Sequence, residues 1–160
     1  MDLLETIIPE GQAIQRLWHE KAANRRLPAR ADFSIDDLRP WMGRLILVDI
    51  LPDGNLFYRV HGTTLAEQFG QELTGKYLTD MTDIQLRESI RSEYALVVAR
   101  RAPMVFRRRR DYGDRGSYDT ERIVLPLSHG GNTVDQALSL ADWLPASHRP
   151  APAIIRRSTV

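Results

Sequence analysis

Arginine side chains form the densest charge cluster in the sequence. The run Arg107–Arg110, with Arg100 and Arg101 just upstream, places six positive charges within eleven residues that include no acidic residue. Guanidinium groups keep their charge at physiological pH and bind carboxylates or phosphates through paired hydrogen bonds. Because side chains alternate along a strand, successive arginines of the run should point to opposite faces. The run therefore cannot form a single flat basic stripe.

Three interpretations of Arg107–Arg110 stay open. The first is an exposed edge strand whose charge prevents pairing with other sheets. The acidic residues that would neutralise it across a hairpin are Asp111, Asp114, Asp119 and Glu121. The second is a contact surface for an acidic protein partner or an anionic ligand. The third, nucleic acid, is disfavoured because the net charge is only +1 and no helix is predicted to present a basic face.

Cysteine and histidine limit the possible cofactors. The sequence contains no cysteine, so it cannot form a disulfide, a thiolate metal site or a sulfur-linked chromophore. The four histidines are His19, His61, His129 and His148. No two of them fall at ligand spacing, and we expect no metal site. The GxSxG, GxxxxGK[ST] and GxGxxG motifs are absent, so we expect no catalysis of the kinds they serve.

The bulk properties predict one compact domain. The chain has 160 residues, of which 42% are hydrophobic and 27% charged. Its first residues are acidic, unlike a signal peptide, and the longest purely apolar run, Leu45–Val48, is far too short to span a membrane. We therefore expect a cytoplasmic location.

Residues 10–25 are predicted to form an amphipathic helix. Ile14, Leu17 and Trp18 fall on one stripe at helical spacing. Such a stripe must be buried, either on the chain's own sheet or against a second copy of the protein.

The rest of the chain alternates strands and helices. Residues 44–61 read as a β-hairpin around Pro52-Asp53-Gly54-Asn55. On it, Asp49 is the expected partner of Arg59. Capping boxes predict two helices. Thr64 with Glu67 begins a short one, and Thr82 with Gln85 begins a long one over residues 83–101. Strands are predicted over residues 104–112, 118–127 and 133–142.

This order predicts an α+β fold, with a five-stranded antiparallel sheet, helices on one face and an N-terminal flanking helix. We divide the chain into an N-terminal helix and linker (residues 1–30), a core (31–142) and a C-terminal tail (143–160).

The same order resembles that of a PAS domain. The stretch from Arg26 to Thr79 resembles the small single-domain PAS type common in alphaproteobacteria, and the most specific residues follow the hairpin. They are Tyr58-Arg59, Gly62-Thr63, Phe69-Gly70 and Leu73-Thr74-Gly75. The resemblance implies a sensory or regulatory module without catalysis. Such a module would bind a small ligand, a signalling protein such as a sensor kinase, or both. The alternative is a ligand-free homodimeric scaffold or adaptor.

The resemblance also suggests cofactors and site residues. Covalent PAS chromophores need a cysteine and are excluded, and haem is disfavoured because residues 83–101 contain no histidine. Flavin bound without an adduct stays possible, so the cofactor is unknown. The ligand-pocket candidates are Tyr58, Arg59, His61, Phe69, Tyr94 and Trp143. The candidates for a homodimer interface are Ile14, Leu17 and Trp18. The candidates for anion or partner contact are Arg107, Arg108, Arg109 and Arg110.

Overall fold

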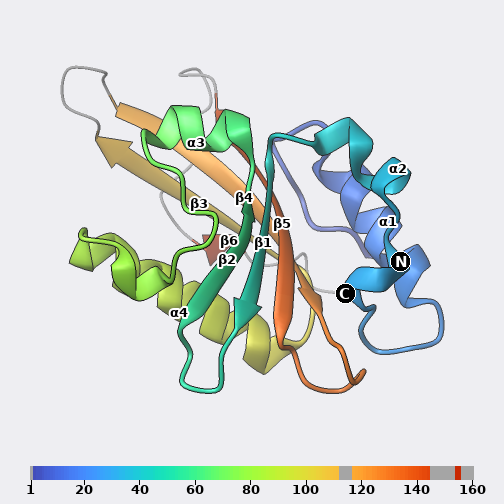
Figure 1. The fold of residues 1–160 in the computed structure, drawn as a ribbon. Helices are drawn as coiled ribbons and strands as arrows, with labels where there is room; N and C mark the ends of the chain where they lie inside the picture. The colour runs from blue at the N-terminus through green and yellow to red at the C-terminus, as the bar shows by residue number, and fades with distance from the viewer. Residues whose placement is uncertain (1, 112–116, 145–153, 156–160) are drawn as a thin grey trace.

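A computed structural model describes residues 2–111, 117–144 and 154–155 (Figure 1). Its centre is an antiparallel sheet with the strand order β2-β1-β5-β4-β3-β6. The strands are β1 (Leu45–Ile50), β2 (Leu56–His61), β3 (Met104–Asp111), β4 (Ser117–Leu127), β5 (Gln136–Leu144) and β6 (Ile154–Ile155). The helices are α1 (Gly11–Ala22), α2 (Ile35–Leu38), α3 (Thr63–Phe69) and α4 (Ile84–Arg100). Three single 3₁₀ turns are η1 (Arg30–Asp32), η2 (Arg39–Trp41) and η3 (Leu78–Asp80).

The predicted α+β class and the five antiparallel strands are confirmed. Two details differ at the C-terminal end. Strand β5 runs on to Leu144, two residues past the expected end of the core, so Trp143 lies in the sheet and not in a tail. The short strand β6 pairs with Val105 and Phe106 of β3, where no strand was predicted.

Helices cover both faces of the sheet (Figure 1). Helices α3 and α4 lie on one face, where Val48, Tyr94 and Phe106 belong to one buried cluster. The N-terminal segment, α1 and α2 cover the other face, where Ile14, Trp18 and other side chains pack with residues of β1, β4 and β5. Both layers remove apolar surface from water, which is the main favourable term in folding.

The apolar stripe of α1 is buried within its own chain. Ile14 is fully buried, Trp18 is 4% exposed, and the Trp18 indole N–H donates to the carbonyl of Pro126 at 2.8 Å. Leu17 is half-buried at the edge of the same cluster. This corrects the assignment of Ile14 and Trp18 to a dimer interface, because their side chains already pack on the sheet.

The helix starts differ from the predicted capping boxes. Helix α4 begins after Asp83, whose carboxylate accepts from the backbone N–H of Leu86 at 3.0 Å, so Thr82 is not its cap. Helix α3 begins after Gly62 with no side-chain cap, so the box predicted from Thr64 does not form. Gly70 ends α3 in the left-handed conformation, with φ of 83°, as a glycine C-cap does.

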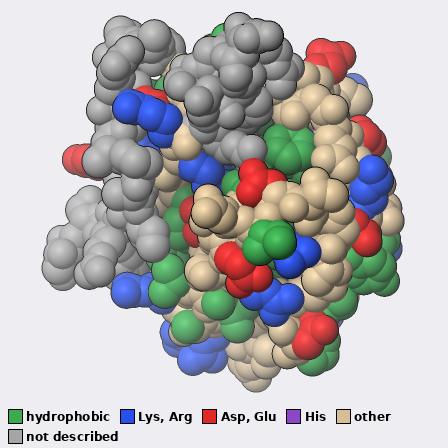
Figure 2. Space-filling view, turned by 90° about the vertical axis from the view of Figure 1, so that its left-hand side faces the viewer, with side chains coloured by type: hydrophobic (Ala, Val, Ile, Leu, Met, Phe, Trp, Pro, Cys, Tyr) green, Lys and Arg blue, Asp and Glu red, His purple; other side chains and the backbone are tan. Residues whose placement is uncertain are grey.

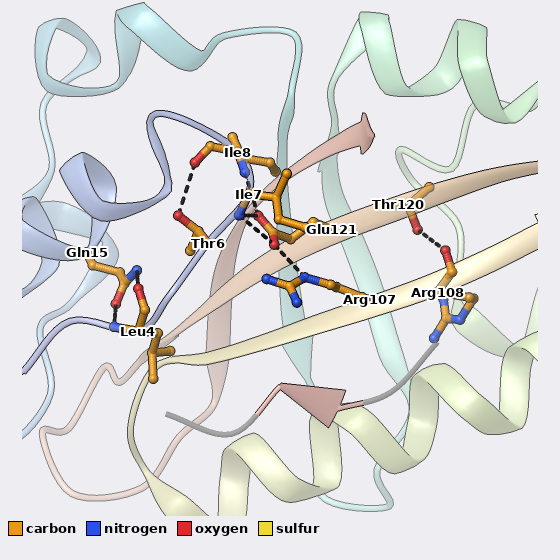
Figure 3. Close-up of polar contacts among 9 residues, drawn as sticks. All are labelled: Leu4, Thr6, Ile7, Ile8, Gln15, Arg107, Arg108, Thr120 and Glu121. Carbon is orange, nitrogen blue, oxygen red and sulfur yellow. Dashed lines mark hydrogen bonds and ion pairs between the residues drawn. The ribbon is translucent and has the colours of Figure 1, made fainter. Parts of the chain in front are cut away.

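A buried carboxylate holds the N-terminal segment on the sheet (Figure 3). The fully buried Glu121 of β4 accepts hydrogen bonds from the backbone N–H groups of Ile7 and Ile8 at 2.7–2.9 Å. Arg107 of β3 donates to the same carboxylate at 2.8 Å. Buried charges are stable only when paired and hydrogen-bonded, and Glu121 meets both conditions. Chain segments more than 110 residues apart are thus joined at one side chain.

Candidate functional site

A cavity of about 120 Å³ lies between the sheet and the helices α3 and α4. Most of its wall is apolar. The wall includes Ile46, Leu65, Phe69, Leu86, Ile90 and Phe106, contributed by strands β1 and β3 and by both helices. A cavity needs only about 10–15 Å³ of such volume to hold a single water, so this one is large enough for a small organic molecule.

Five charged side chains line this cavity, and three of them, from different elements, form one cluster. The other two, Glu121 and Asp142, pair with Arg107 and Arg44. The Glu93 carboxylate of α4 accepts a hydrogen bond from Arg122 of β4 at 2.7 Å and a second one from Arg108 of β3. Phe106 and Arg108 are two residues apart on β3, so their side chains point to the same face of the sheet. Arg122 is the cross-strand partner of Phe106 and therefore points to that face too, as does Thr120, the partner of Arg108. The result is one carboxylate shared by two guanidinium groups.

Two aromatic rings flank Arg122. Its side chain is 12% exposed, and its guanidinium carbon lies 5.2 Å from the centre of the Tyr94 ring and 5.6 Å from that of Phe106. Burial is the largest single influence and opposes the charged form, but the Glu93 carboxylate together with Tyr94 and Tyr58 outweighs it, so the pKa of Arg122 is raised. Arg122 therefore stays charged in the cavity wall. Its Nε–H is buried and has no hydrogen-bond partner among the described residues.

His61 ends strand β2 at the cavity. Its Nδ1 accepts the backbone N–H of Leu73 at 3.2 Å, so the neutral ring carries its proton on Nε2. Burial lowers the pKa of His61, which is 7% exposed. The ring also stands edge-on to Tyr58 and Phe69, with centroids 6.3 and 6.1 Å away. His61 is thus a neutral donor among aromatic side chains.

Tyr58 supplies a second neutral donor, its hydroxyl, to the same wall. It is 3% exposed, and burial together with the nearby Tyr94 raises the pKa of its phenol. It therefore stays protonated and can donate a hydrogen bond.

Four of the six predicted pocket residues line the cavity, namely Tyr58, His61, Phe69 and Trp143. Tyr94 lies behind the wall, where its ring supports Arg122 and its hydroxyl lies 3.4 Å from that of Ser139. Arg59 is outside the cavity. Its side chain is 57% exposed and pairs with Asp49 at 2.7 Å, which is the partner that the sequence predicted. This corrects the assignment of Arg59 to the pocket.

The arginine run divides between the two faces of β3, as strand alternation predicted. Arg107 and Arg109 pair with Glu121 and Asp119 on the face of the N-terminal segment. Arg108 points to the opposite face and pairs with Glu93. The side chains of Arg110 and Asp111, and the whole of Asp114, lie outside the described residues.

The surface on the left in Figure 1 is mixed in charge. Basic and acidic side chains lie among apolar ones there, with no uniformly basic area among the coloured atoms (Figure 2). Within the part of the chain that the structure describes, no group of three potential metal ligands lies together. No helix there is long and apolar enough to cross a membrane.

Sequence reasoning missed Glu93 and Arg122. They are 29 residues apart, in a helix and a strand, and neither belongs to a motif. One signal was present, because Glu93 follows Ile90 by three residues and therefore lies near the apolar face of α4.

Comparison with known proteins agrees with this architecture. The family model described as PAS domain matches residues 8–141, which is most of the chain. A search of curated proteins finds no match. A sheet with a helix-covered cavity on one face, together with this match, defines a sensory or regulatory domain. The chain belongs to the PAS domain family.

Proposed function

We propose that this protein is a sensory or regulatory module that binds a small ligand in the cavity and contacts a signalling protein in trans, without catalysis. The observation that carries the proposal is the cavity itself. Its wall is apolar, and three charged side chains from α4, β3 and β4 meet at one point of it. Ligand sites commonly combine an apolar wall with a few convergent polar groups.

Native mass spectrometry of the protein purified from its own host, with an absorbance spectrum, tests the ligand. We expect a non-covalent mass increment that is lost on denaturation. Ile90 lines the cavity from α4, so Ile90→Trp should fill the space and remove the increment. Ile84→Trp is the matched control, because Ile84 lies on the same helix but is 62% exposed.

The alternative function is a ligand-free homodimeric scaffold or adaptor. A bare, colourless protein that is dimeric in solution would favour the scaffold over ligand sensing. An increment that survives in Ile90→Trp would place the ligand elsewhere and contradict the cavity as the binding site.

A further inference from the structure

We propose that the cavity takes a neutral molecule with one aromatic ring and a carbonyl or similar acceptor, which meets the Tyr58 hydroxyl and the Nε2–H of His61. This inference rests on the proposed function, because it names the chemical class of the ligand for the same cavity. The structural reasons are the pairing of the charges in the wall, two open neutral donors, and the size and aromatic lining of the space.

Each of the five charged side chains that line the cavity is paired with a side chain of opposite charge. The pairs are Glu93 with Arg108 and Arg122, Glu121 with Arg107, and Asp142 with Arg44. An ionic ligand would lose its hydration on entry and would meet only groups that are already paired. Burying a charge without a partner is costly, so the wall favours a neutral ligand.

Two neutral donors of the wall are unpaired. Neither the Tyr58 hydroxyl nor Nε2 of His61 has a hydrogen-bond partner among the described residues, although the two residues are only 3% and 7% exposed. Neither atom is among the described side-chain atoms that lack both a partner and accessible surface, so both are open to the cavity that their residues line. The ring centroids are 6.3 Å apart, so one small molecule can meet both donors.

These two donors select for an acceptor on the ligand. Because Nδ1 of His61 already accepts from the Leu73 N–H, the neutral ring offers the cavity only a donor. Burial raises the pKa of the Tyr58 phenol, which therefore keeps its proton to donate. Leaving a buried donor unsatisfied is costly, and a carbonyl oxygen has two lone pairs with which to accept.

The size and lining of the cavity fit a single aromatic ring. Its volume of about 120 Å³ is close to that of an apolar cavity that holds benzene, about 150 Å³. Phe69, Phe106 and Trp143 contribute rings to the wall. Aromatic rings favour edge-to-face and offset contacts with one another, so a flat ring gains more from this wall than an aliphatic chain of the same size.

Isothermal titration calorimetry near neutral pH tests this inference with four probes of similar shape. Acetophenone is neutral and carries an acceptor, ethylbenzene lacks the acceptor, benzoate is an anion and benzamidinium is a cation. We expect acetophenone to bind about fivefold more tightly than ethylbenzene, as for one neutral hydrogen bond. Both ions should bind about tenfold more weakly than acetophenone or worse, because each brings an unpaired charge. Ile90→Trp should reduce binding of every probe that binds.

The variant Tyr58→Phe removes one donor and keeps the ring. Its affinity for acetophenone should fall about threefold, and its affinity for ethylbenzene should not change. Tyr77→Phe is the matched control, because Tyr77 is 43% exposed and does not line the cavity. Thermal unfolding of each variant establishes that it is folded.

The outcomes separate this inference from the proposed function. Benzoate or benzamidinium binding as tightly as acetophenone would overturn the neutral class while cavity binding stands. Ethylbenzene binding as tightly as acetophenone, or an unchanged acetophenone affinity in Tyr58→Phe, would overturn the acceptor contact in the same way. If no probe binds, the native ligand found by mass spectrometry decides. A neutral ring with an acceptor would then support the inference, any other ligand would overturn it, and a bare protein would overturn both the inference and the proposed function.

Discussion

The imidazole of His61 lies where burial and one hydrogen bond both favour its neutral form. Burial lowers its pKa below the ordinary value of 6.5. Protonation would also place a hydrogen on Nδ1, which would then lose its bond from the Leu73 N–H. The unfolded chain therefore binds a proton more readily than the folded chain as the pH falls through 6.5.

We predict that the free energy of unfolding decreases as the pH falls from 7.5 to 5. For a base whose folded-state pKa is depressed, this contribution is fully present above the unfolded-state pKa and is lost below it. The paired carboxylates of Glu10, Asp32, Asp37 and Glu72 have pKa values lowered below 4.5 or 3.8, so they titrate at lower pH. Urea unfolding at several pH values measures the slope.

The variant His61→Asn isolates the contribution of His61, because an amide oxygen can still accept from Leu73 but does not titrate. The free energy of unfolding of His61→Asn should fall less steeply than that of the wild type as the pH decreases from 7.5 to 5. Burial also lowers the pKa of His19, so some slope should remain in His61→Asn. Identical slopes in both proteins would show that His61 does not contribute.

The role of Gly62 is an example of a tertiary contact that the residue types alone could not predict. Its backbone, with φ of −54° and ψ of 145°, is open to any residue, so its conformation does not require glycine. The structural reason is a close approach between chain segments. A Cβ atom at Gly62 would lie 2.2 Å from the carbonyl oxygen of Gly43. Such a contact depends on tertiary structure and leaves no local signal in the sequence.

At the scale of elements, the β3–β4 hairpin joins two separate ionic clusters. Neighbouring residues of β4 serve opposite faces, since Glu121 binds the N-terminal segment and Arg122 binds Glu93 of α4. Strand alternation made this division predictable for the arginines of β3. The acidic partner on α4 was not predictable, because it depends on where a distant helix lies on the sheet.

We predict that Glu121→Gln loosens the N-terminal segment. The amide cannot reproduce both backbone acceptor contacts, and Arg107, whose side chain is 12% exposed, loses its ion-pair partner. Breaking a buried pair on one side costs about 3 kcal/mol or more. Hydrogen exchange should show faster exchange of the Ile7 and Ile8 amides, and denaturant unfolding should show the loss of stability.

The matched control for Glu121→Gln is Asp36→Asn, which also replaces an acid by its amide. Asp36 pairs with Arg39 on the surface, where the two side chains are 84% and 71% exposed, so little change is expected. Exchange of the Ile7 and Ile8 amides at the wild-type rate in Glu121→Gln would mean that packing alone holds the segment.

The sequence predicted the strands and long helices well because their signals are local. Alternation, turn residues and helical spacing act within a few residues of one another. Element ends were less accurate, and Asp83 capped α4 in place of its neighbour Thr82. The aromatic part of the cavity followed from the family-like motif around Tyr58 and Phe69. The charged part did not, because Glu93 and Arg122 meet only in the folded chain.

For the molecule as a whole, the sequence left one main question open: whether the apolar stripe of α1 packs on its own sheet or on a second copy of the protein. An apolar stripe shows that it must be buried but does not identify what buries it. The structure places Trp18 on its own sheet, where it also donates to Pro126. A homodimer stays a prediction.

We predict that Trp18→Ala lowers the stability of the single chain by about 3–5 kcal/mol, as expected for removal of a buried tryptophan. Because the contact is within one chain, the unfolding midpoint of Trp18→Ala should depend on protein concentration no more than that of the wild type. The mass in solution should also stay at the wild-type value. Arg16→Ala, at an exposed position of the same helix, should change stability by no more than about 0.5 kcal/mol. A loss of dimer mass in Trp18→Ala with unchanged unfolding would instead place Trp18 between two copies of the chain.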